Sequence, residues 1–215
     1  MLKFTIKDDI RGFKAGQVFE FDDVPWQVMV GANGSGKSTL MQALRGRFPP
    51  KKEITLLADE FKKLAASIQI ETDFEQILFL DAIIDDPVHH MNVYDACSYV
   101  DAGNFQTRYL SHGQKALNLL GRIMVAPRSA KKTLVVLDEV DGGLELRYQA
   151  AFCNVLRKLY TDQGFYSLLI THNPLVMLAA DFVYDFNRAI EGKNPIKMSR
   201  SYLNEQINFD KLIGV

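Results

Sequence analysis

Hydrophobic and polar residues follow two periods along the chain, and each period predicts one type of element. Alternation predicts half-buried strands at 2–7 and 17–21. Continuous apolar runs predict buried strands at 26–30 (WQVMV), 133–140 (TLVVLDEV) and 166–171 (YSLLIT). Further strands are expected at 66–71, 77–84, 182–186 and 196–198, the last two as a pair.

Apolar residues at helical spacing predict helices between these strands. One follows the glycine-rich turn after residue 30, and the others are expected at 58–66, 111–125, 144–161 and from 173 onward. Residues 85–109 have mixed signals that predict irregular structure with a short helix, and the pattern is indecisive for 200–215. Buried strands that alternate with helices predict an α/β fold with a mainly parallel central sheet.

Composition narrows the class of protein. Of 215 residues, 47% are hydrophobic, enough for a substantial core, and a formal net charge of −1 gives no global sign of nucleic-acid binding. The two cysteines, Cys97 and Cys153, have no metal-binding spacing, which favours a reducing, cytoplasmic setting. The N-terminus has no signal-peptide pattern, and no apolar run approaches the roughly 20 residues that span a bilayer. A membrane role would therefore need another chain to cross the membrane.

The stretch GANGSGKS, Gly31 to Ser38, matches the pattern G-x-x-x-x-G-K-[ST] without a mismatch. A predicted buried strand precedes it and a helix follows it, which is the context in which this pattern binds phosphate. Backbone N–H groups can converge there on a β-phosphate, Lys37 would bridge the β- and γ-phosphates, and Ser38 would offer its hydroxyl to Mg²⁺. The alternative is a chance glycine turn. The predicted ATP-binding residues are Gly31, Ala32, Asn33, Gly34, Ser35, Gly36, Lys37, Ser38 and Thr39.

Two acidic residues end the apolar run VVLDE, at the sheet edge where the phosphate loop is expected. Asp138 would hold the Mg²⁺ shell, and Glu139 would polarise an attacking water. His172 follows the next apolar strand to the same edge, where a neutral imidazole can donate an N–H to a γ-phosphate. The alternatives are a solvated acidic turn and a structural histidine.

In this order and spacing, the motifs resemble those of the ABC-type ATPases, over about residues 2–198. LSHGQ (110–114) resembles the family signature LSGGQ, with His112 in place of the first glycine, and VVLDE matches Walker B. VDGGLE lies where the D-loop belongs, with Asp141 as its aspartate, and ITHNP resembles the H-switch. The resemblance implies a P-loop fold with a small antiparallel N-terminal sheet and a short helical subdomain. The implied signature residues are Ser111, His112, Gly113 and Gln114.

The resemblance also implies a mechanism. In this family the signature opens a helix that faces the γ-phosphate bound by the other subunit. That role gives a reason for Gly113, since glycine costs about 1 kcal/mol relative to alanine in a helix. ATP joins two protomers head to tail, Glu139 activates water, and hydrolysis opens the dimer. Because the same chain carries both halves of the site, a homodimer is the simplest assembly.

Two departures from the family pattern bear on the type of ATPase. A glutamine should end the strand before the helical subdomain, but Asp81 stands there and Gln76 lies at the start of the strand. Asp81 would then contact Mg²⁺ or water. The span from Lys37 to Ser111 is also short for a transporter subunit, whose larger helical subdomain grips the membrane chains.

The N-terminal segment around IRGFKAG resembles the Rad50/SMC/RecF-like ATPases, although this chain has no coiled coil. Arg11 and Phe13 would then contact nucleotide, unless they are exposed loop residues. The expected organisation is a single stand-alone ATPase domain, 1–215. It comprises a core lobe (1–50 and 125–198), a compact lobe carrying the signature (about 51–124) and a tail (199–215).

The leading hypothesis is therefore a soluble Mg²⁺-dependent ATPase that acts as an ATP-gated dimer on DNA or a protein partner, in repair, recombination or defence. One alternative is the nucleotide-binding subunit of an ABC transporter. Another is an ATP-clamped regulatory module with little turnover. A small-molecule kinase would not explain LSHGQ or ITHNP.

Overall fold

A computed structural model describes residues 1–49, 55–81, 120–121, 130–142 and 144–199. In chain order the elements are β1 (Leu2–Ile6), β2 (Val18–Phe21), β3 (Trp26–Val30), α1 (Lys37–Arg47), α2 (Thr55–Ser67), β4 (Ile68–Thr72), β5 (Gln76–Asp81), β6 (Thr133–Asp138), α4 (Leu146–Gln163), β7 (Tyr166–Ile170), α5 (Pro174–Ala179), β8 (Phe182–Asp185), the 3-10 helix η3 (Ala189–Glu191) and β9 (Ile196–Ser199).

The strands form two sheets. The larger is six-stranded with the order β5-β6-β7-β3-β8-β9, and the smaller is three-stranded with the order β2-β1-β4. In the larger sheet β5, β6, β7, β3 and β8 run parallel to one another, and β9 runs antiparallel to β8. Both pairings in the smaller sheet are antiparallel. The mainly parallel central sheet and the small antiparallel N-terminal sheet are thus confirmed.

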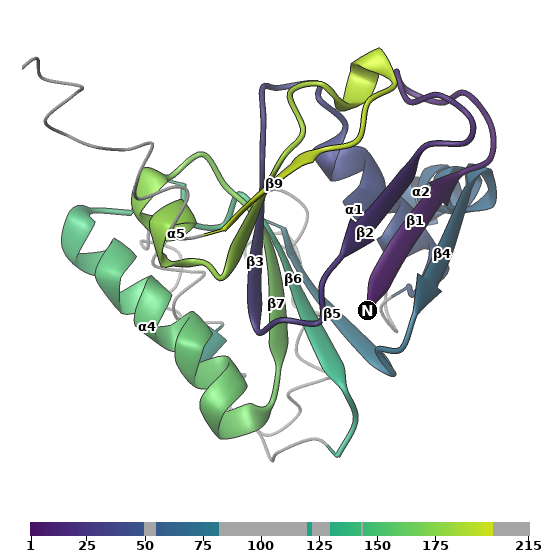
Figure 1. The fold of residues 1–215 in the computed structure, drawn as a ribbon. Coiled ribbons are helices and arrows are strands. Elements are labelled where there is room, and N and C mark those ends of the chain that lie inside the picture. Colours follow the sequence, from purple (N-terminus) through teal and green to yellow (C-terminus); the bar gives the residue numbers. More distant parts are fainter. Residues whose placement is uncertain (50–54, 82–119, 122–129, 143, 200–215) are drawn as a thin grey trace, which may run out of the picture.

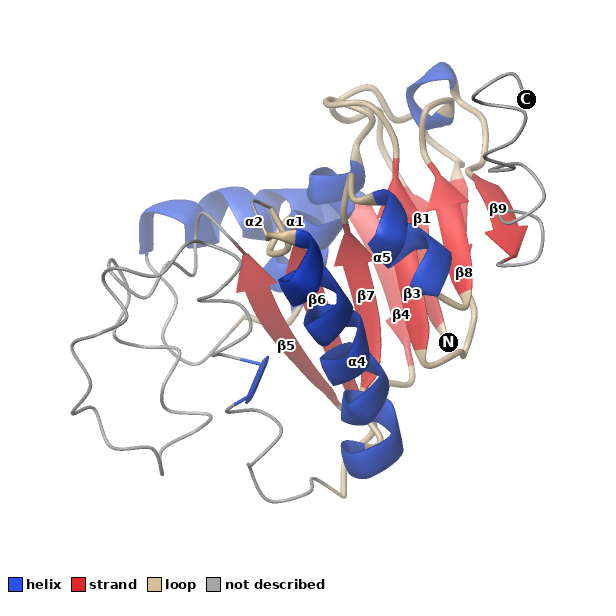
Figure 2. Cartoon of the chain, turned by 90° about the vertical axis from the view of Figure 1, so that its left-hand side faces the viewer, coloured by secondary structure: helices blue, strands red, loops and turns tan. Residues whose placement is uncertain are grey.

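The larger sheet has apolar layers on both faces. On one face, α4 and α5 cover a core that includes Val28, Leu137 and Phe152; α4 crosses in front of β6 and β7 in Figure 2. On the other face, α1 and the antiparallel sheet enclose a second core that includes Phe4 and Phe186. Figure 1 shows the antiparallel sheet and α1 together on the side away from α4. Burial on both faces explains why the parallel strands are continuous apolar runs.

Several predicted boundaries are corrected by the structure. The strand expected at 133–140 ends at Asp138, because Glu139 takes a left-handed backbone conformation with φ of 51°. The helix expected at 58–66 spans Thr55–Ser67. The expected pairing of 182–186 with 196–198 is confirmed by β8 and β9. The predictions for 85–109 and 200–215 lie outside the described residues, as does 111–125 apart from 120–121, which are helical.

The parallel arrangement determines where functional side chains can gather. Strands β3, β6 and β7 are hydrogen-bonded neighbours that run in the same direction. Their carboxyl ends therefore meet at one edge of the sheet, which is where ligands bind in open α/β sheets. The glycine-rich loop follows β3, the acidic pair ends β6, and His172 follows β7.

Candidate nucleotide-binding site

The loop between β3 and α1 is folded as a phosphate cradle. Gly31, Gly34 and Gly36 have φ values of 141°, 82° and 96°, which side-chain-bearing residues rarely adopt. The Ser35 N–H donates to the Ala32 carbonyl at 3.1 Å, which closes the turn. The helix α1 begins at Lys37, so its unpaired N-terminal N–H groups open onto this loop. These features fit an anion, and the nucleotide-binding residues predicted from the sequence lie in this loop and in the first turn of α1.

Lys37 is the cation at the centre of this loop. Its Nζ donates to the Gly31 carbonyl at 2.7 Å, the Ala32 carbonyl at 3.0 Å and the Ser35 hydroxyl at 3.3 Å. Burial lowers the pKa of Lys37, whereas the carboxylates of Glu139, Asp138 and Asp185 act in the opposite direction. The ammonium is therefore held by loop carbonyls and lies within the field of three carboxylates.

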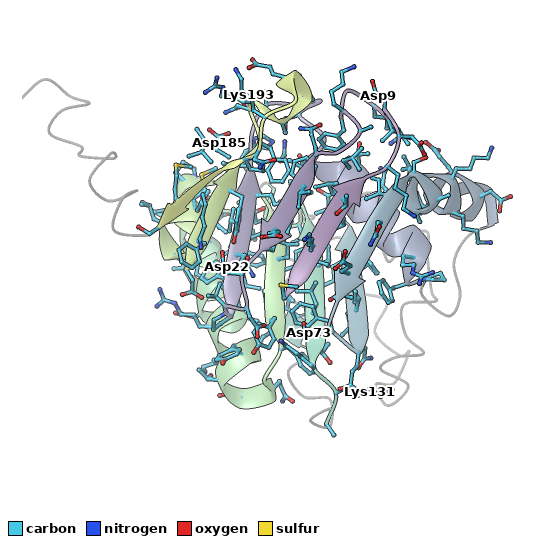
Figure 3. All side chains as sticks on the ribbon, turned by 45° about the vertical axis from the view of Figure 1, so that its right-hand side comes forward. Asp9, Asp22, Asp73, Lys131, Asp185 and Lys193 are labelled. Carbon is cyan, nitrogen blue, oxygen red and sulfur yellow. The ribbon has the colours of Figure 1, made fainter. Side chains whose placement is uncertain are left out.

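Asp185 and Asn187 also belong to the site, although no sequence motif points to them. The Ala32 N–H donates to Asn187 Oδ1 at 2.7 Å, and the Asn187 N–H donates to Asp185 Oδ1 at 2.9 Å. A Cβ atom on Gly31 would lie 3.2 Å from the Asn187 nitrogen. Figure 3 shows Asp185 near the upper end of the molecule, opposite Asp73 and Lys131. The end of β8 thus supports the first residues of the phosphate loop.

Glu139 and His172 lie side by side at the sheet edge where both were expected. His172 Nε2 is 3.5 Å from Glu139 Oε1, and the two side chains are 50% and 52% exposed. The Glu139 N–H donates to the Ile170 carbonyl at 3.0 Å, so the turn after β6 is bonded to the end of β7. The carboxylate and the imidazole are therefore adjacent, and solvent reaches both.

Asp141, the predicted D-loop aspartate, is buried within its own protomer. It is 4% exposed, and its Oδ2 accepts a hydrogen bond from the Thr171 hydroxyl at 2.5 Å. Burial raises the pKa of Asp141, while the bond from Thr171 acts to lower it. The sequence had singled out Asp141 but not Thr171, which precedes the H-switch histidine.

The predicted magnesium ligands lie around the same edge. Ser38 is in the first turn of α1 and Asp138 ends β6. Asp81 is the backbone partner of Asp138 in the β5–β6 register, and its side chain lies outside the described set. Gln76 is at the other end of β5, where its Oε1 lies 3.4 Å from the Thr133 hydroxyl oxygen. Of these two candidates for the Q-loop position, only Asp81 is at the carboxyl edge.

The donor set suits Mg²⁺ bound together with phosphate. Mg²⁺ usually takes one or two protein oxygens and completes its shell with phosphate oxygens and water. Across the described ranges, no group of three or more His, Cys, Asp or Glu side chains could hold a metal ion by itself. A hydroxyl and a carboxylate beside a phosphate loop fit a metal that arrives with its nucleotide.

The predicted nucleotide contacts of Arg11 and Phe13 are not supported. Phe13 is 1% exposed, and its ring lies beneath Gly36 and 5.1 Å from the ring of Phe19, centroid to centroid. Arg11 donates to Gln42 on α1 at 2.7 Å and pairs with Glu60 on α2. Phe13 is therefore a core residue, whereas Arg11 is an exposed residue that ties its loop to two helices.

The signature residues Ser111, His112, Gly113 and Gln114 lie outside the described residues. Their predicted role in trans therefore stays a prediction. Within the described part of the chain, no helix has the length and apolar character needed to cross a bilayer.

Comparison with known proteins supports the motif assignment. The ABC transporter family pattern matches residues 19–141, more than half of the chain. The energy-coupling factor transporter ATP-binding protein EcfA1 of Staphylococcus aureus is 26% identical over 207 residues, covering 86% of this chain and 72% of its own length. The zinc import ATP-binding protein ZnuC of Ruegeria pomeroyi is 29% identical over 158 residues, covering 71% of this chain and 60% of its own length.

Among solved structures, the fold is similar to a dimeric ATP-binding cassette in a post-hydrolysis state with ADP and Pi. The TM-score is 0.54 at 15% identity, and the match covers 93% of this chain and 99% of that one. The relatives are transporter ATPases, so the comparisons favour the transporter alternative over the DNA-processing hypothesis. The family match and the P-loop α/β fold lead to one conclusion: the chain belongs to the ABC transporter family and is an ABC-type ATPase.

Proposed function

We propose that this chain is the ATP-binding subunit of an ABC transporter and that it hydrolyses ATP between two head-to-tail protomers. The observation that carries the hydrolytic part is the Glu139–His172 pair, with Oε1 and Nε2 3.5 Å apart, at the same sheet edge as the phosphate loop. The transport part is supported by the relatives, whose names describe transporter ATP-binding proteins.

Each side chain of the site has a distinct task in this proposal. The loop N–H groups and Lys37 bind the β- and γ-phosphates. To do so, Lys37 replaces its hydrogen bonds to the Gly31 and Ala32 carbonyls with bonds to the phosphates. Glu139 orients and polarises the attacking water, and His172 donates an N–H to the γ-phosphate. Ser38 and Asp138 would hold Mg²⁺, which supplies charge neutralisation at the phosphates when bound.

The dimer completes the site. The exposure of Glu139 and His172, about half of each side chain, leaves room for a second protomer to cover the phosphates. We propose that Ser111, His112, Gly113 and Gln114 of the partner protomer supply that cover. A homodimer is the simplest closure because both halves are encoded in one chain. The solved cassette to which this fold is similar is itself dimeric, which is consistent with a dimer here.

The transporter assignment also specifies where the protein would work. A subunit of this kind binds membrane chains that supply the transport path, at the cytoplasmic face of the membrane. The transported substrate would be determined by those chains: the name of one relative specifies zinc import, whereas the name of the other, an energy-coupling factor transporter, specifies no substrate.

Glu139→Gln tests the hydrolytic part. The variant should bind ATP with Mg²⁺ but lose at least about 100-fold in turnover, because the amide cannot accept a proton from water. It should also accumulate as a dimer with ATP in size-exclusion chromatography with light scattering. Glu71→Gln, an exposed carboxylate on β4, is the matched control. Wild-type turnover by Glu139→Gln would refute the assigned role of the carboxylate.

Affinity purification from detergent-solubilised membranes of the native cell tests the transport part. Recovery of a chain with membrane spans, in fixed ratio to this protein, would support it. Turnover that double-stranded DNA stimulates strongly at low salt, with the stimulation lost as salt increases, would instead favour a DNA-processing ATPase.

A further inference from the structure

Thr171 connects the turn after β6 to the loop that carries His172. Its hydroxyl donates to Asp141 Oδ2 at 2.5 Å and accepts the Asn173 N–H at 2.9 Å. Its own N–H donates to the Met29 carbonyl of β3 at 3.4 Å. One hydroxyl therefore binds both the residue that follows His172 and a carboxylate from the turn after the neighbouring strand.

Asp141 is well placed to act as the fixed end of this connection. It follows Glu139 by two residues, and the turn between them is closed by a bond from the Gly142 N–H to the Glu139 carbonyl at 3.2 Å. A second bond, from the Leu144 N–H to the Asp141 carbonyl at 3.3 Å, continues the turn. Because Asp141 is 4% exposed, water does not compete well for its hydrogen bond with Thr171.

The other end of the connection is a helix start. Asn173 Oδ1 accepts the Leu175 N–H at 3.0 Å and caps α5, and Pro174 begins the helix. His172 thus lies between two residues that are each held by a hydrogen bond. Thr171 is bonded to Asp141, and Asn173 is bonded to Leu175 of α5. The backbone of His172 has little freedom to move relative to Glu139 while both bonds are intact.

We propose that Asp141 and Thr171 are positioning residues whose hydrogen bond holds His172 beside Glu139 during ATP hydrolysis. This inference rests on the proposed roles of Glu139 and His172. The bond joins the two turns that carry the reacting groups, so its loss would let the imidazole drift from the carboxylate. A displacement of about 1 Å in such a site can cost about 100-fold in rate.

A merely structural bond would behave differently. If the bond had only a structural role, its loss would lower stability without a selective effect on turnover. Thr171→Val removes the hydroxyl at nearly constant volume, and Thr171→Ser restores it. A positioning role predicts a kcat about 10- to 100-fold lower for Thr171→Val, with the KM for ATP changed less than about threefold. Thr171→Ser should recover most of the rate.

The deciding experiment is a double-mutant cycle with His172→Ala, measured by steady-state ATP hydrolysis below the unfolding transition of every variant. If Thr171 acts through His172, Thr171→Val slows the wild type but has no further effect in the His172→Ala background. Equal slowing in both backgrounds would overturn the proposal. If Thr171→Val does not fold, Asp141→Asn replaces it in the cycle, because the amide keeps the volume and weakens the bond.

Thr133→Val is the matched control. Thr133 is also fully buried, and its hydroxyl donates to the Lys131 carbonyl at 3.0 Å at the opposite end of the sheet. It should lower stability by a similar amount and leave kcat within about twofold. A kcat loss for Thr133→Val equal to that for Thr171→Val would show a general stability effect and overturn the proposal. A His172→Ala variant with wild-type turnover would also refute the assigned role of His172. If His172→Ala is slow and Thr171→Val slows it further by the same factor as in the wild type, only the positioning role of the Asp141–Thr171 hydrogen bond is refuted.

Discussion

The ring of Phe13 lies directly against Gly36, so that a Cβ atom on Gly36 would be 2.1 Å from the ring. Gly36 is the N-cap of α1 and has φ of 96°. Phe13 comes from the loop between β1 and β2 and is buried beside Phe19. The antiparallel N-terminal sheet therefore supports the phosphate loop from below, through an aromatic ring that only glycine can accommodate.

Gly36→Ala should disrupt the phosphate loop for two separate reasons. The left-handed backbone costs a residue with a Cβ roughly 1–2 kcal/mol, and the methyl group would also clash with Phe13. ATP affinity, measured by isothermal titration calorimetry, should fall at least about tenfold. Phe13→Ala in the same chain should recover part of this loss, because it removes the clash and leaves the strain.

Gly16→Ala is the control for strain alone. Gly16 has φ of 86°, and its added Cβ would meet no described atom within 4 Å. It should destabilise the protein modestly and leave ATP affinity unchanged. Equal loss of affinity from Gly16→Ala and Gly36→Ala would contradict the role of the Phe13 contact.

Local pattern was sufficient for the strands and for the motifs at the carboxyl edge. The residues Gly31 to Ser38 have a fixed spacing, and a buried strand must deliver Asp138 and Glu139 to the end that it shares with its parallel neighbours. The short distance between Glu139 and His172 follows from the adjacency of β6 and β7. Sequence alone therefore placed these side chains at one edge of the sheet.

The supporting residues were not predictable because their contacts are distant in sequence. Asn187 binds the Ala32 N–H across 155 positions, and Thr171 binds Asp141 across 30. No periodicity or spacing encodes such a pair. Phe13 was misassigned for a related reason: a loop position suggests exposure, whereas packing against Gly36 is decided by the tertiary fold.

Asn187→Ala should weaken nucleotide binding without abolishing it. The Ala32 N–H loses its acceptor at 2.7 Å, and one hydrogen bond contributes about 0.5–1.5 kcal/mol, which corresponds to about 2- to 12-fold in affinity. The dissociation constants of ATP for the variant and the wild type are the measurement. Asn194→Ala, an exposed asparagine in the same β8–β9 connection, is the control. Unchanged affinity for Asn187→Ala would mean that the loop holds its shape without this bond.

Gly46→Ala should separate α1 from α2. A Cβ atom on Gly46 would lie 2.1 Å from the Phe61 carbonyl oxygen, which is backbone and cannot rotate away. Overpacking of this kind costs about 1–3 kcal/mol, more than alanine gains over glycine in a helix. Urea unfolding should therefore show a lower midpoint, whereas Arg47→Ala, on the exposed side of the same helix, should change it little. A stabilised Gly46→Ala variant would contradict the close approach of the two helices.

Asp22 should make the stability of the protein sensitive to acid. It accepts a hydrogen bond from the Tyr184 hydroxyl and pairs with Lys197 Nζ at 2.6 Å, which joins the β2–β3 turn to β8 and β9. Figure 3 shows Asp22 well below Asp185, away from the site edge. Partial burial opposes ionisation, but the hydrogen bonds from Lys197 and Tyr184 prevail and lower the pKa of Asp22 below its ordinary value of 3.8.

A lowered pKa in the folded state sets the sign of this effect. The ionised carboxylate stabilises the fold fully at pH values above 3.8, and the contribution is lost as the pH falls through the folded-state pKa. The free energy of unfolding, measured with urea, should therefore be larger for the wild type than for Asp22→Asn. This margin should be constant near neutral pH and shrink below about pH 4. Asp59→Asn, whose side chain is 81% exposed on α2, controls for the change in net charge. A margin that stays constant to pH 3 would mean that the charge of the Asp22 carboxylate contributes nothing to the difference in stability.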